Sequence, residues 1–313
     1  MAGHADRVWT AVSQSNGHAE HVLSWRRCVR LHGLAPERRG GVQQLGAREL
    51  GAAREETAGL ITAASQHLDR LSQVFVRTGA CLALSDARGV VLERRSSDGD
   101  ARDFLDLGLC EGADWGEAAM GTNGIGTALA EERAVAIHRD KHFLPANTRL
   151  SCATAPIRDH RARIAGSLDI SSCRYDTNEA ILGVFLLAAQ EAAAQIEADM
   201  FRAAFPGARL VLAPGRAGPQ GLLAVDGDDV VIGANHAARR ALGLDDAALA
   251  APRSVQEVLG ESAEAPVPGF EAAERRTLRL ALAQSGGNVS AAATRLGVSR
   301  ATLHRKLKRL DLR

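Results

Sequence analysis

The stretch GGNVSAAATRLGVSRATLHRKLKRLDL, residues 286–312, decides the fold of the C-terminal end of the chain. The small side chain of Ala293 lets two helices cross closely, and Gly297, four residues later, suits the positive φ of a tight turn. Ser299 is a favoured N-cap for the helix that follows. The spacing therefore predicts a helix-turn-helix, preceded by a first helix over about 271–284. The apolar face of the third helix repeats at i, i+4 and i+7 as Leu303, Leu307 and Leu310.

The opposite face of this third helix is basic. Residues 270–313 hold ten Lys or Arg against three Asp or Glu, although the 313-residue chain carries only +1 at pH 7. A recognition helix meets base edges with its N-terminal end and phosphates with its later cations. A solvated basic helix of a small bundle is the alternative, but the charge, the spacing and the cap together favour double-stranded DNA as the partner. The cations lie at Arg300, His304, Arg305 and Lys308, with Lys306 and Arg309 on the flanks.

Residues 286–312 resemble the Fis-type helix-turn-helix that ends bacterial enhancer-binding activators. In that family His304 stands at a position that is often Tyr or Arg. Fis-type domains act as dimers, so the resemblance implies a homodimer and an operator with two-fold symmetry. The residues that the resemblance places in contact with DNA are Ser299, Arg300, Thr302, Arg305 and Lys306.

A second glycine-rich stretch, MGTNGIGTAL at 120–129, raises the question of nucleotide binding. A Walker A loop needs a lysine directly after its last glycine, and here no lysine occurs before Lys141. The spacing of three and then two residues between the glycines also fails the dinucleotide pattern G-x-G-x-x-G. The stretch therefore predicts a turn that shapes a pocket, or one that serves packing alone. It matches neither nucleotide-binding motif, so we expect no nucleotide hydrolysis.

Roughly residues 20–200 resemble the GAF sensor domain of the acetoin-catabolism regulator family. The matching blocks are LSWRRCVRLHGLAPE, LALSDARGVVLERRS, GADWGEAAMGTNGIGTAL, KHF and CATAPIRDHRARIAGSLDIS. In that family these segments line or buttress a cavity for a small molecule. The resemblance implies an unidentified effector, with a pocket that involves Trp115, Thr122, Asn123, His138 and Cys152.

Enzymatic and metal chemistry find little support in the sequence. His138 and His142 stand at i, i+4, but the segment between them is not expected to be helical. No third ligand is obvious, although Cys152 is a candidate and Asp140 a weaker one. The five cysteines are spread out without a C-x-x-C pair, which is typical of buried, reduced thiols. A reductase that uses the GAF cavity would need a pair of low-pKa cysteines. We therefore expect no metal, no cofactor and no enzymatic activity.

Hydrophobic patterning predicts an α+β layout, with a sheet covered by helices on one side. Short helices are expected within 7–34, a long helix from 42 to 76, and a closing helix from about 178 to 205. Five strands lie between the long helices, at 81–86, 90–96, 134–138, 152–158 and 163–170. The expected domains are an N-terminal helical segment (1–41), the GAF domain (42–205), a linker with a partial PAS-like segment (206–262) and the helix-turn-helix (269–313).

The family normally carries an ATPase domain between its sensor and its helix-turn-helix. Here only ESAEAPVPG, residues 261–269, stands in that place. The resemblance therefore covers the sensor and the helix-turn-helix but not the ATPase domain. We expect a ligand-responsive, sequence-specific transcriptional regulator without ATPase activity. Three modes stay open: repression by occupancy, activation by contact with RNA polymerase, or inhibition of a full-length relative in mixed dimers. An architectural DNA-binding protein is the rival class.

The bulk composition favours a cytoplasmic protein. Apolar residues make up 46% and charged residues 24% of the chain, which is ordinary for a soluble protein. The first 25 residues contain no apolar core of a secretory signal. The longest apolar run, ILGVFLLAA at 181–189, is too short to span a bilayer, so we expect no membrane association.

Overall fold

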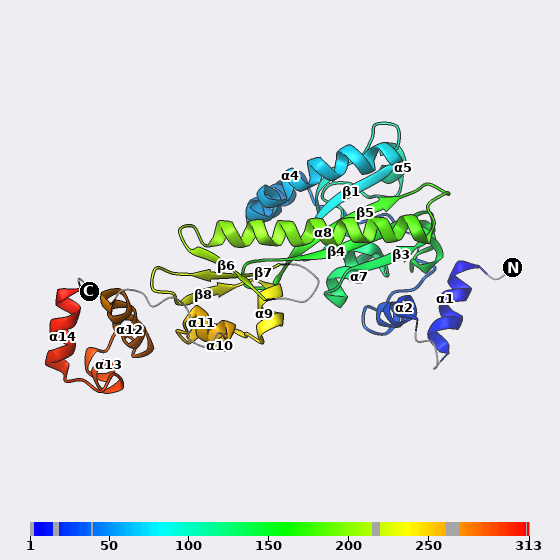
Figure 1. Ribbon diagram of the computed structural model, residues 1–313. Helices are drawn as coiled ribbons and strands as arrows, with labels where there is room; N and C mark the ends of the chain where they lie inside the picture. Colours follow the sequence, from blue (N-terminus) through cyan, green and yellow to red (C-terminus); the bar gives the residue numbers. More distant parts are fainter. Residues whose placement is uncertain are drawn as a thin grey trace. The chain divides into compact units, whose positions relative to one another are not determined.

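The structure, a computed structural model, describes residues 3–14, 19–38, 40–214, 220–260, 270–310 and 312. The chain forms two compact units. The N-terminal unit comprises Met1–Asp159 with Arg163–Met200, and the C-terminal unit comprises His160–Ala162 with Phe201–Arg313. Each unit is described by itself below (Figure 1).

A five-stranded antiparallel sheet with the order β2-β1-β5-β4-β3 forms the centre of the N-terminal unit. The central strands are buried on both faces, and this agrees with their nearly continuous runs of apolar and small residues. The strands are β1 (Ala80–Asp86), β2 (Val91–Arg95), β3 (Val135–His138), β4 (Ser151–Arg158) and β5 (Ile164–Ser172).

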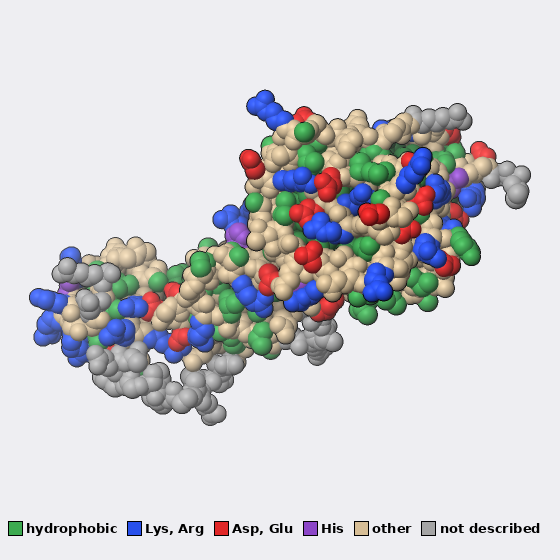
Figure 2. All heavy atoms as spheres, turned by 90° about the horizontal axis from the view of Figure 1, so that it is seen from above, with side chains coloured by type: hydrophobic (Ala, Val, Ile, Leu, Met, Phe, Trp, Pro, Cys, Tyr) green, Lys and Arg blue, Asp and Glu red, His purple; other side chains and the backbone are tan. Residues whose placement is uncertain are grey.

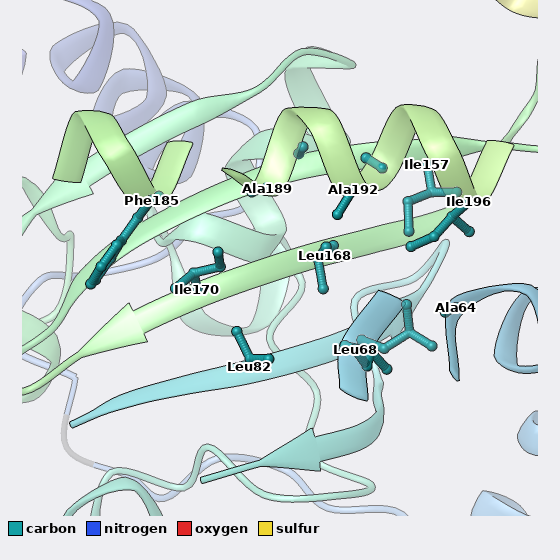
Figure 3. Packing of buried hydrophobic residues seen from close by; sticks show 14 of the residues in the cluster. Ala64, Leu68, Leu82, Ile157, Leu168, Ile170, Phe185, Ala189, Ala192 and Ile196 are labelled. Carbon is teal, nitrogen blue, oxygen red and sulfur yellow. The ribbon is translucent and has the colours of Figure 1, made fainter. Parts of the chain in front are cut away.

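Two long helices, α4 (Ala58–Phe75) and α8 (Glu179–Ala204), pack on one face of this sheet. Because side chains alternate along a strand, Leu82 of β1 faces these helices while its neighbour Cys81 faces the other way. In Figure 3 the labelled side chains of α8 lie over those of β5 and β1. The residues of this core that Figure 3 labels are Ala64, Leu68, Leu82, Ile157, Leu168, Ile170, Phe185, Ala189, Ala192 and Ile196.

The opposite face of the sheet is also covered. Three short helices, α5 (Ala101–Asp106), α6 (Glu117–Met120) and α7 (Gly124–Glu131), lie between β2 and β3 in the chain. The aromatic rings of Phe104 and Trp115 pack from these segments onto the odd-numbered side chains of β1. The α+β fold is confirmed, but the helices do not keep to one side of the sheet as the patterning had predicted.

The single long helix predicted over 42–76 is wrong. The structure has α3 (Ala47–Glu56) and α4, which are separated at Thr57, where φ is −103° and ψ is 17°. Residues 42–46 are not helical, and Gln44 forms a β-bridge with Ala113. The two short helices expected within 7–34 are present as α1 (His4–Ser13) and α2 (Glu20–Arg30).

Helix α8 extends well beyond the apolar run 181–189, to 26 residues. It is long and apolar enough to cross a membrane by length and composition, and it is the one such helix among the described residues. One such helix is weak evidence, because core helices pass the same test. The face of α8 that carries Leu182, Phe185 and Ile196 packs on the sheet, as expected of a core helix.

The C-terminal unit contains a small three-stranded antiparallel sheet, β6-β7-β8, and two groups of helices. The strands are β6 (Arg209–Ala213), β7 (Gly221–Val225) and β8 (Val231–Ala234), followed by α9 (His236–Leu242), α10 (Asp246–Ala250) and α11 (Val255–Leu259). The strand-turn-strand-helix expected at 221–250 is therefore present. The predicted linker at 261–269 lies outside the described residues. Beyond it come α12 (Phe270–Gln284), α13 (Val289–Arg295) and α14 (Arg300–Arg309).

Candidate DNA-binding interface and sensor region

The last three helices form a capped helix-turn-helix. Ser299 accepts a hydrogen bond at its Oγ from the backbone N–H of Thr302 at 3.1 Å, and so caps α14 as the sequence predicts. Gly297 has a φ of +65°, the left-handed conformation expected in the turn. Helix α13 is capped by Asn288, whose Oδ1 accepts from the N–H of Ser290 and of Ala291.

A compact apolar core holds the three helices together. The two alanines Ala292 and Ala293 are buried where α13 crosses its neighbours, and Leu296 and Val298 are partly buried beside them. The third helix turns all three predicted leucines inward. The buried members of this core are Leu278, Ala281, Ala292, Ala293, Leu303, Leu307, Leu310 and Leu312.

The polar face of α14 stays at the surface. Thr302 is half-buried, and its hydroxyl lies 2.9 Å from that of Ser299. Figure 2 shows Lys and Arg side chains gathered over the part of the chain that carries α12–α14. The exposed residues among those predicted to meet DNA are Ser299, Arg300, His304, Arg305 and Lys308.

One predicted DNA contact is engaged inside the domain. Lys306 forms an ion pair with Glu274 of α12, and Arg309 pairs with the same carboxylate. Hydrogen bonding from Lys306 lowers the pKa of Glu274, so the carboxylate is held ionised. These pairs link α12 to α14, and they give Lys306 a role within the fold beside any role toward DNA.

In the sensor region, Asn123 acts as a structural clamp. Its Oδ1 caps α7 by accepting from the N–H of Gly126 at 2.9 Å. Its Nδ2 donates to the carbonyl oxygens of Trp115 at 3.0 Å and of Gly121 at 2.8 Å. The side chain is fully buried, and these bonds hold the glycine-rich turn in place.

Trp115 and Thr122 are likewise buried against protein groups. The indole Nε1 of Trp115 donates to the carbonyl oxygen of Gly108 at 3.0 Å, and the ring joins the core on the sheet face opposite α8. The hydroxyl of Thr122 lies 2.7 Å from that of Ser24 on α2. Both residues therefore connect the glycine-rich turn to neighbouring segments of the unit.

The glycines of this turn permit a close approach of backbones. A Cβ atom on Gly126 would lie 2.3 Å from the backbone nitrogen of Glu117. A Cβ on Gly124 would lie 2.4 Å from the hydroxyl oxygen of Thr154 and 2.7 Å from a carboxylate oxygen of Asp169. The packing interpretation of this stretch therefore holds for its two helical glycines.

His138 at the end of β3, Cys152 on β4 and His142, which follows the 3-10 turn Arg139–Lys141, belong to adjoining segments. His142 is fully buried, its Nδ1 donates to the carbonyl oxygen of Arg139 at 2.9 Å, and its Nε2 lies 3.4 Å from the sulfur of Cys152. Burial lowers the pKa of His142 to about 4, so the ring is neutral at pH 7. His138 instead meets the hydroxyl of Ser151 at its Nδ1, at 2.9 Å.

Burial also governs the thiols and one carboxyl group of this region. It raises the pKa of Cys152 well above its ordinary value, and that of Cys81 to about 12. Asp169 on β5 accepts hydrogen bonds from Thr154 and Ser171, but burial raises its pKa to about 6. Among the described residues, no group of three or more His, Cys, Asp or Glu side chains is placed to hold a metal ion.

Sequence reasoning missed the residue that joins the N-terminal helices to the sensor. Glu117 is 5% exposed, and its carboxylate receives Arg27 at both oxygens and the hydroxyl of Ser24 at 2.9 Å. His32 lies 3.6 Å from the same carboxylate. The partners are about 90 residues apart in the chain, so no local spacing signals this pairing.

Comparison with known families agrees with this architecture. Residues 6–198 match the model described as "MimR, N-terminal domain". The chain belongs to the MimR family. Residues 269–310 match the model described as "Bacterial regulatory protein, Fis family", which confirms the Fis-type helix-turn-helix, a DNA-binding fold.

Relatives of this MimR-family chain include named regulators, which confirms the expected resemblance to acetoin-catabolism regulators. The acetoin catabolism regulatory protein of Cupriavidus necator is 33% identical over 69% of this chain and 33% of its own length. The propane 2-monooxygenase operon transcriptional activator MimR of Mycolicibacterium smegmatis is 32% identical over 76% of this chain and 40% of its own length. The chain thus spans between a third and two fifths of these two relatives.

A solved structure shares the fold. In the complex of DhaR(N) and DhaL from E. coli, the matched chain has a TM-score of 0.52 and 20% sequence identity. The match covers 76% of this chain and 81% of that one. It supports the mixed α/β sensor architecture of the MimR-family chain.

Proposed function

We propose that this protein is a ligand-responsive, sequence-specific DNA-binding transcriptional regulator that works without ATPase activity. The observation that carries the proposal is helix α14: Ser299 caps it, its leucines are buried, and its cations Arg300, Arg305 and Lys308 are exposed. A helix with one face anchored in a small core and a cationic face free is built to enter the major groove.

The residues of α14 divide by their place along the helix. Ser299, Arg300 and Thr302 lie at its N-terminal end, where base edges are read. Arg305 and Lys308 lie further along, where phosphate contacts position the protein on the duplex. His304 and Lys306 complete the proposed interface, and Lys306 must then share its charge between DNA and Glu274.

The sensor is proposed to act by a population shift. A small molecule bound in the N-terminal unit favours one arrangement of a homodimer, and α4 and α8 transmit it to the spacing of the two recognition helices. Trp115, Thr122, Asn123, His138 and Cys152 buttress the sensor region in this scheme. Their hydrogen bonds and burial support such a role.

An apolar stripe on α8 supports the homodimer. Ile181, Val184 and Leu187 follow one another at three-residue intervals and are 38%, 57% and 67% exposed. The side of α8 that faces the sheet is buried, so the stripe leaves a second apolar face at the surface. Exposed apolar patches of this kind mark interaction sites, and the two-fold operator of a Fis-type domain calls for a second copy.

The short connection between α11 and α12 supports a mode of action that does not use an ATPase domain. Between α11 and α12 the chain has only ten residues, 260–269, and no Walker A lysine follows any of its glycine-rich turns. We therefore propose a cytoplasmic regulator that represses by occupancy, contacts RNA polymerase directly, or inhibits a full-length relative in mixed dimers. Its rival is an architectural protein whose sensor unit only dimerises.

Fluorescence anisotropy on DNA from upstream of the gene, compared with random DNA across a salt series, tests the proposal. The wild type should prefer the upstream DNA, and Arg300→Ala should weaken that binding selectively by about 1–3 kcal/mol. Arg77→Ala is the matched control, because Arg77 is an exposed arginine of the N-terminal unit. Equal, salt-steep binding to both DNAs would overturn sequence specificity and favour the architectural protein.

A further inference from the structure

A cavity of about 720 Å³ lies in the N-terminal unit, and none of the five residues that the sequence assigned to the effector pocket lines it. Its size falls within the ordinary range for small-molecule sites. The wall comes from residues 3–5, 37–38, 40–42, 105–108 and 144–147, together with Met120. Segments far apart in the sequence thus converge on one space.

The side-chain amide of Asn147 marks this cavity as a binding site. Asn147 is 1% exposed, and its Nδ2 has no hydrogen-bond partner among the residues that the structure describes. Its backbone is fixed, because its N–H donates to Leu144 at 3.0 Å and its carbonyl accepts from Leu150 at 2.9 Å. A buried donor without a partner costs about 1–3 kcal/mol, so a partner supplied from the cavity would recover that energy.

The remainder of the wall limits the charge of the occupant. Glu37 already accepts the indole N–H of Trp9, and Arg38 donates to the carbonyl oxygen of Ala119 at 2.7 Å. His4 donates through Nε2 to the carbonyl oxygen of His142 at 2.9 Å. Asp106 adds a second carboxylate, so the lining holds two carboxylates against the one guanidinium of Arg38, and this balance disfavours an anion. The apolar wall is formed by Val42, Leu107, Met120 and Leu144.

We propose that this cavity binds a small uncharged molecule with an apolar body and a carbonyl or hydroxyl oxygen, and that the side-chain amide of Asn147, a wall residue, turns so that Nδ2 donates a hydrogen bond to this oxygen. The inference rests on the proposed ligand-responsive function and names the site at which the ligand acts. The predicted sensor residues support its wall. Trp115 holds Gly108, a wall residue, by the indole hydrogen bond, and Thr122 accepts the N–H of Phe143, next to Leu144.

The test uses the full chain, labelled with ¹⁵N, and four probes that share one ring: acetophenone, benzyl alcohol, ethylbenzene and sodium benzoate. The signal is the side-chain amide of Asn147, which is identified by its absence from the spectrum of Asn147→Leu. We expect acetophenone and benzyl alcohol to move this signal and to bind about tenfold more tightly than ethylbenzene, a difference of about 1.4 kcal/mol. Benzoate should bind more weakly than either oxygen-bearing probe.

Two variants distinguish the hydrogen bond of Asn147 to the probe from entry of the probe into the cavity. Asn147→Leu should reduce acetophenone affinity to that of ethylbenzene and leave ethylbenzene binding unchanged. Ala146→Phe, at an exposed wall position, should block all four probes, whereas Ala58→Phe, at an exposed position on α4 outside the cavity, should block none. Failure of the uncharged probes to move the Asn147 signal, or full binding to Ala146→Phe, would overturn the site.

Probe titrations without DNA test the cavity, and separate anisotropy titrations of DNA with and without probe test the proposed function. Probe binding with unaltered DNA affinity would support the cavity and remove ligand responsiveness from the proposed function. A probe that binds the wild type and Ala146→Phe equally, and changes the DNA affinity of both, would overturn the cavity and leave ligand responsiveness standing. Hence each claim has an outcome that overturns it alone.

Discussion

Arg27 of α2 and Glu117 of α6 form a two-point salt bridge, in which Arg27 Nη2 lies 2.7 Å from Glu117 Oε2 and Nε approaches Oε1. The carboxylate is almost fully buried, whereas the guanidinium is about a quarter exposed. Hydrogen bonding to Glu117 raises the pKa of Arg27 above its ordinary range. This pair fastens the N-terminal helices to the segment that leads into the glycine-rich turn.

Removal of the arginine should destabilise the N-terminal unit strongly. Arg27→Ala leaves Glu117 buried without its cation, so we expect the free energy of unfolding to fall by about 3 kcal/mol in urea titrations followed by tryptophan fluorescence. Arg30→Ala, at an exposed position of the same helix, should change it by about 0.5 kcal/mol or less. If the two variants lose equal stability, the buried pair does not hold these helices.

The N-cap of α14 allows stability and DNA binding to be separated. Ser299→Ala removes the hydrogen bond to Thr302 and should destabilise α14 by about 1 kcal/mol, measured by hydrogen exchange of its amides. Ser299→Asp keeps the cap and suits the helix dipole, so the exchange rates should stay near those of the wild type. Its carboxylate should nevertheless weaken DNA binding. Retained DNA affinity in Ser299→Asp would place this end of α14 away from the duplex.

The C-terminal domain could be predicted in detail because its determinants are local. The cap at Ser299, the positive φ of Gly297 and the spacing of the leucines act within about a dozen residues. Each one was therefore visible as a sequence pattern. The ion pair between Lys306 and Glu274 was not, because it depends on how α12 and α14 cross.

The sensor unit was predicted only in outline for the same physical reason. Short runs of apolar and small residues located its five strands, but a break at Thr57 divides a helix that had looked continuous. The cavity around Asn147 depends on segments brought together by tertiary packing, and its unpaired amide has no sequence signature. Hydrophobic patterning predicts the strands and helices, whereas contacts between residues about a hundred positions apart form the cavity.

Asp169 should make stability fall as pH rises. Burial raises its pKa to about 6, so between the unfolded value near 4 and pH 6 the folded state holds a proton that the unfolded state has lost. The wild type should therefore lose about 3 kcal/mol relative to Asp169→Asn between pH 4 and pH 7 in urea titrations. Asp98→Asn, at an exposed position, should give a curve parallel to the wild type. A parallel curve for Asp169→Asn would contradict a protonated Asp169.

The ion pair of Lys306 predicts unequal contributions from two adjacent cations. Arg305 is exposed, so Arg305→Ala should weaken DNA binding about tenfold and reduce the salt slope by about one. Lys306→Ala should weaken it by less than about threefold, since this charge is already partly compensated by Glu274. Glu274→Gln should strengthen DNA binding in the same anisotropy titrations. If Arg305→Ala and Lys306→Ala lose equal DNA affinity, the ion pair with Glu274 does not reduce the contribution of Lys306 to phosphate binding.

The exposed apolar stripe on α8 predicts that a charged substitution within it will dissociate the proposed homodimer. Leu187, at 67%, is the most exposed residue of the stripe, so Leu187→Glu would bury a carboxylate at the proposed dimer interface and should convert a dimer into a monomer in light scattering. It should also weaken operator binding, because two linked helix-turn-helix domains bind a two-fold site with higher effective concentration than one. Leu23→Glu is the matched control, since Leu23 is an exposed leucine of α2 outside the stripe. A Leu187→Glu protein that stays dimeric would place the dimer interface elsewhere.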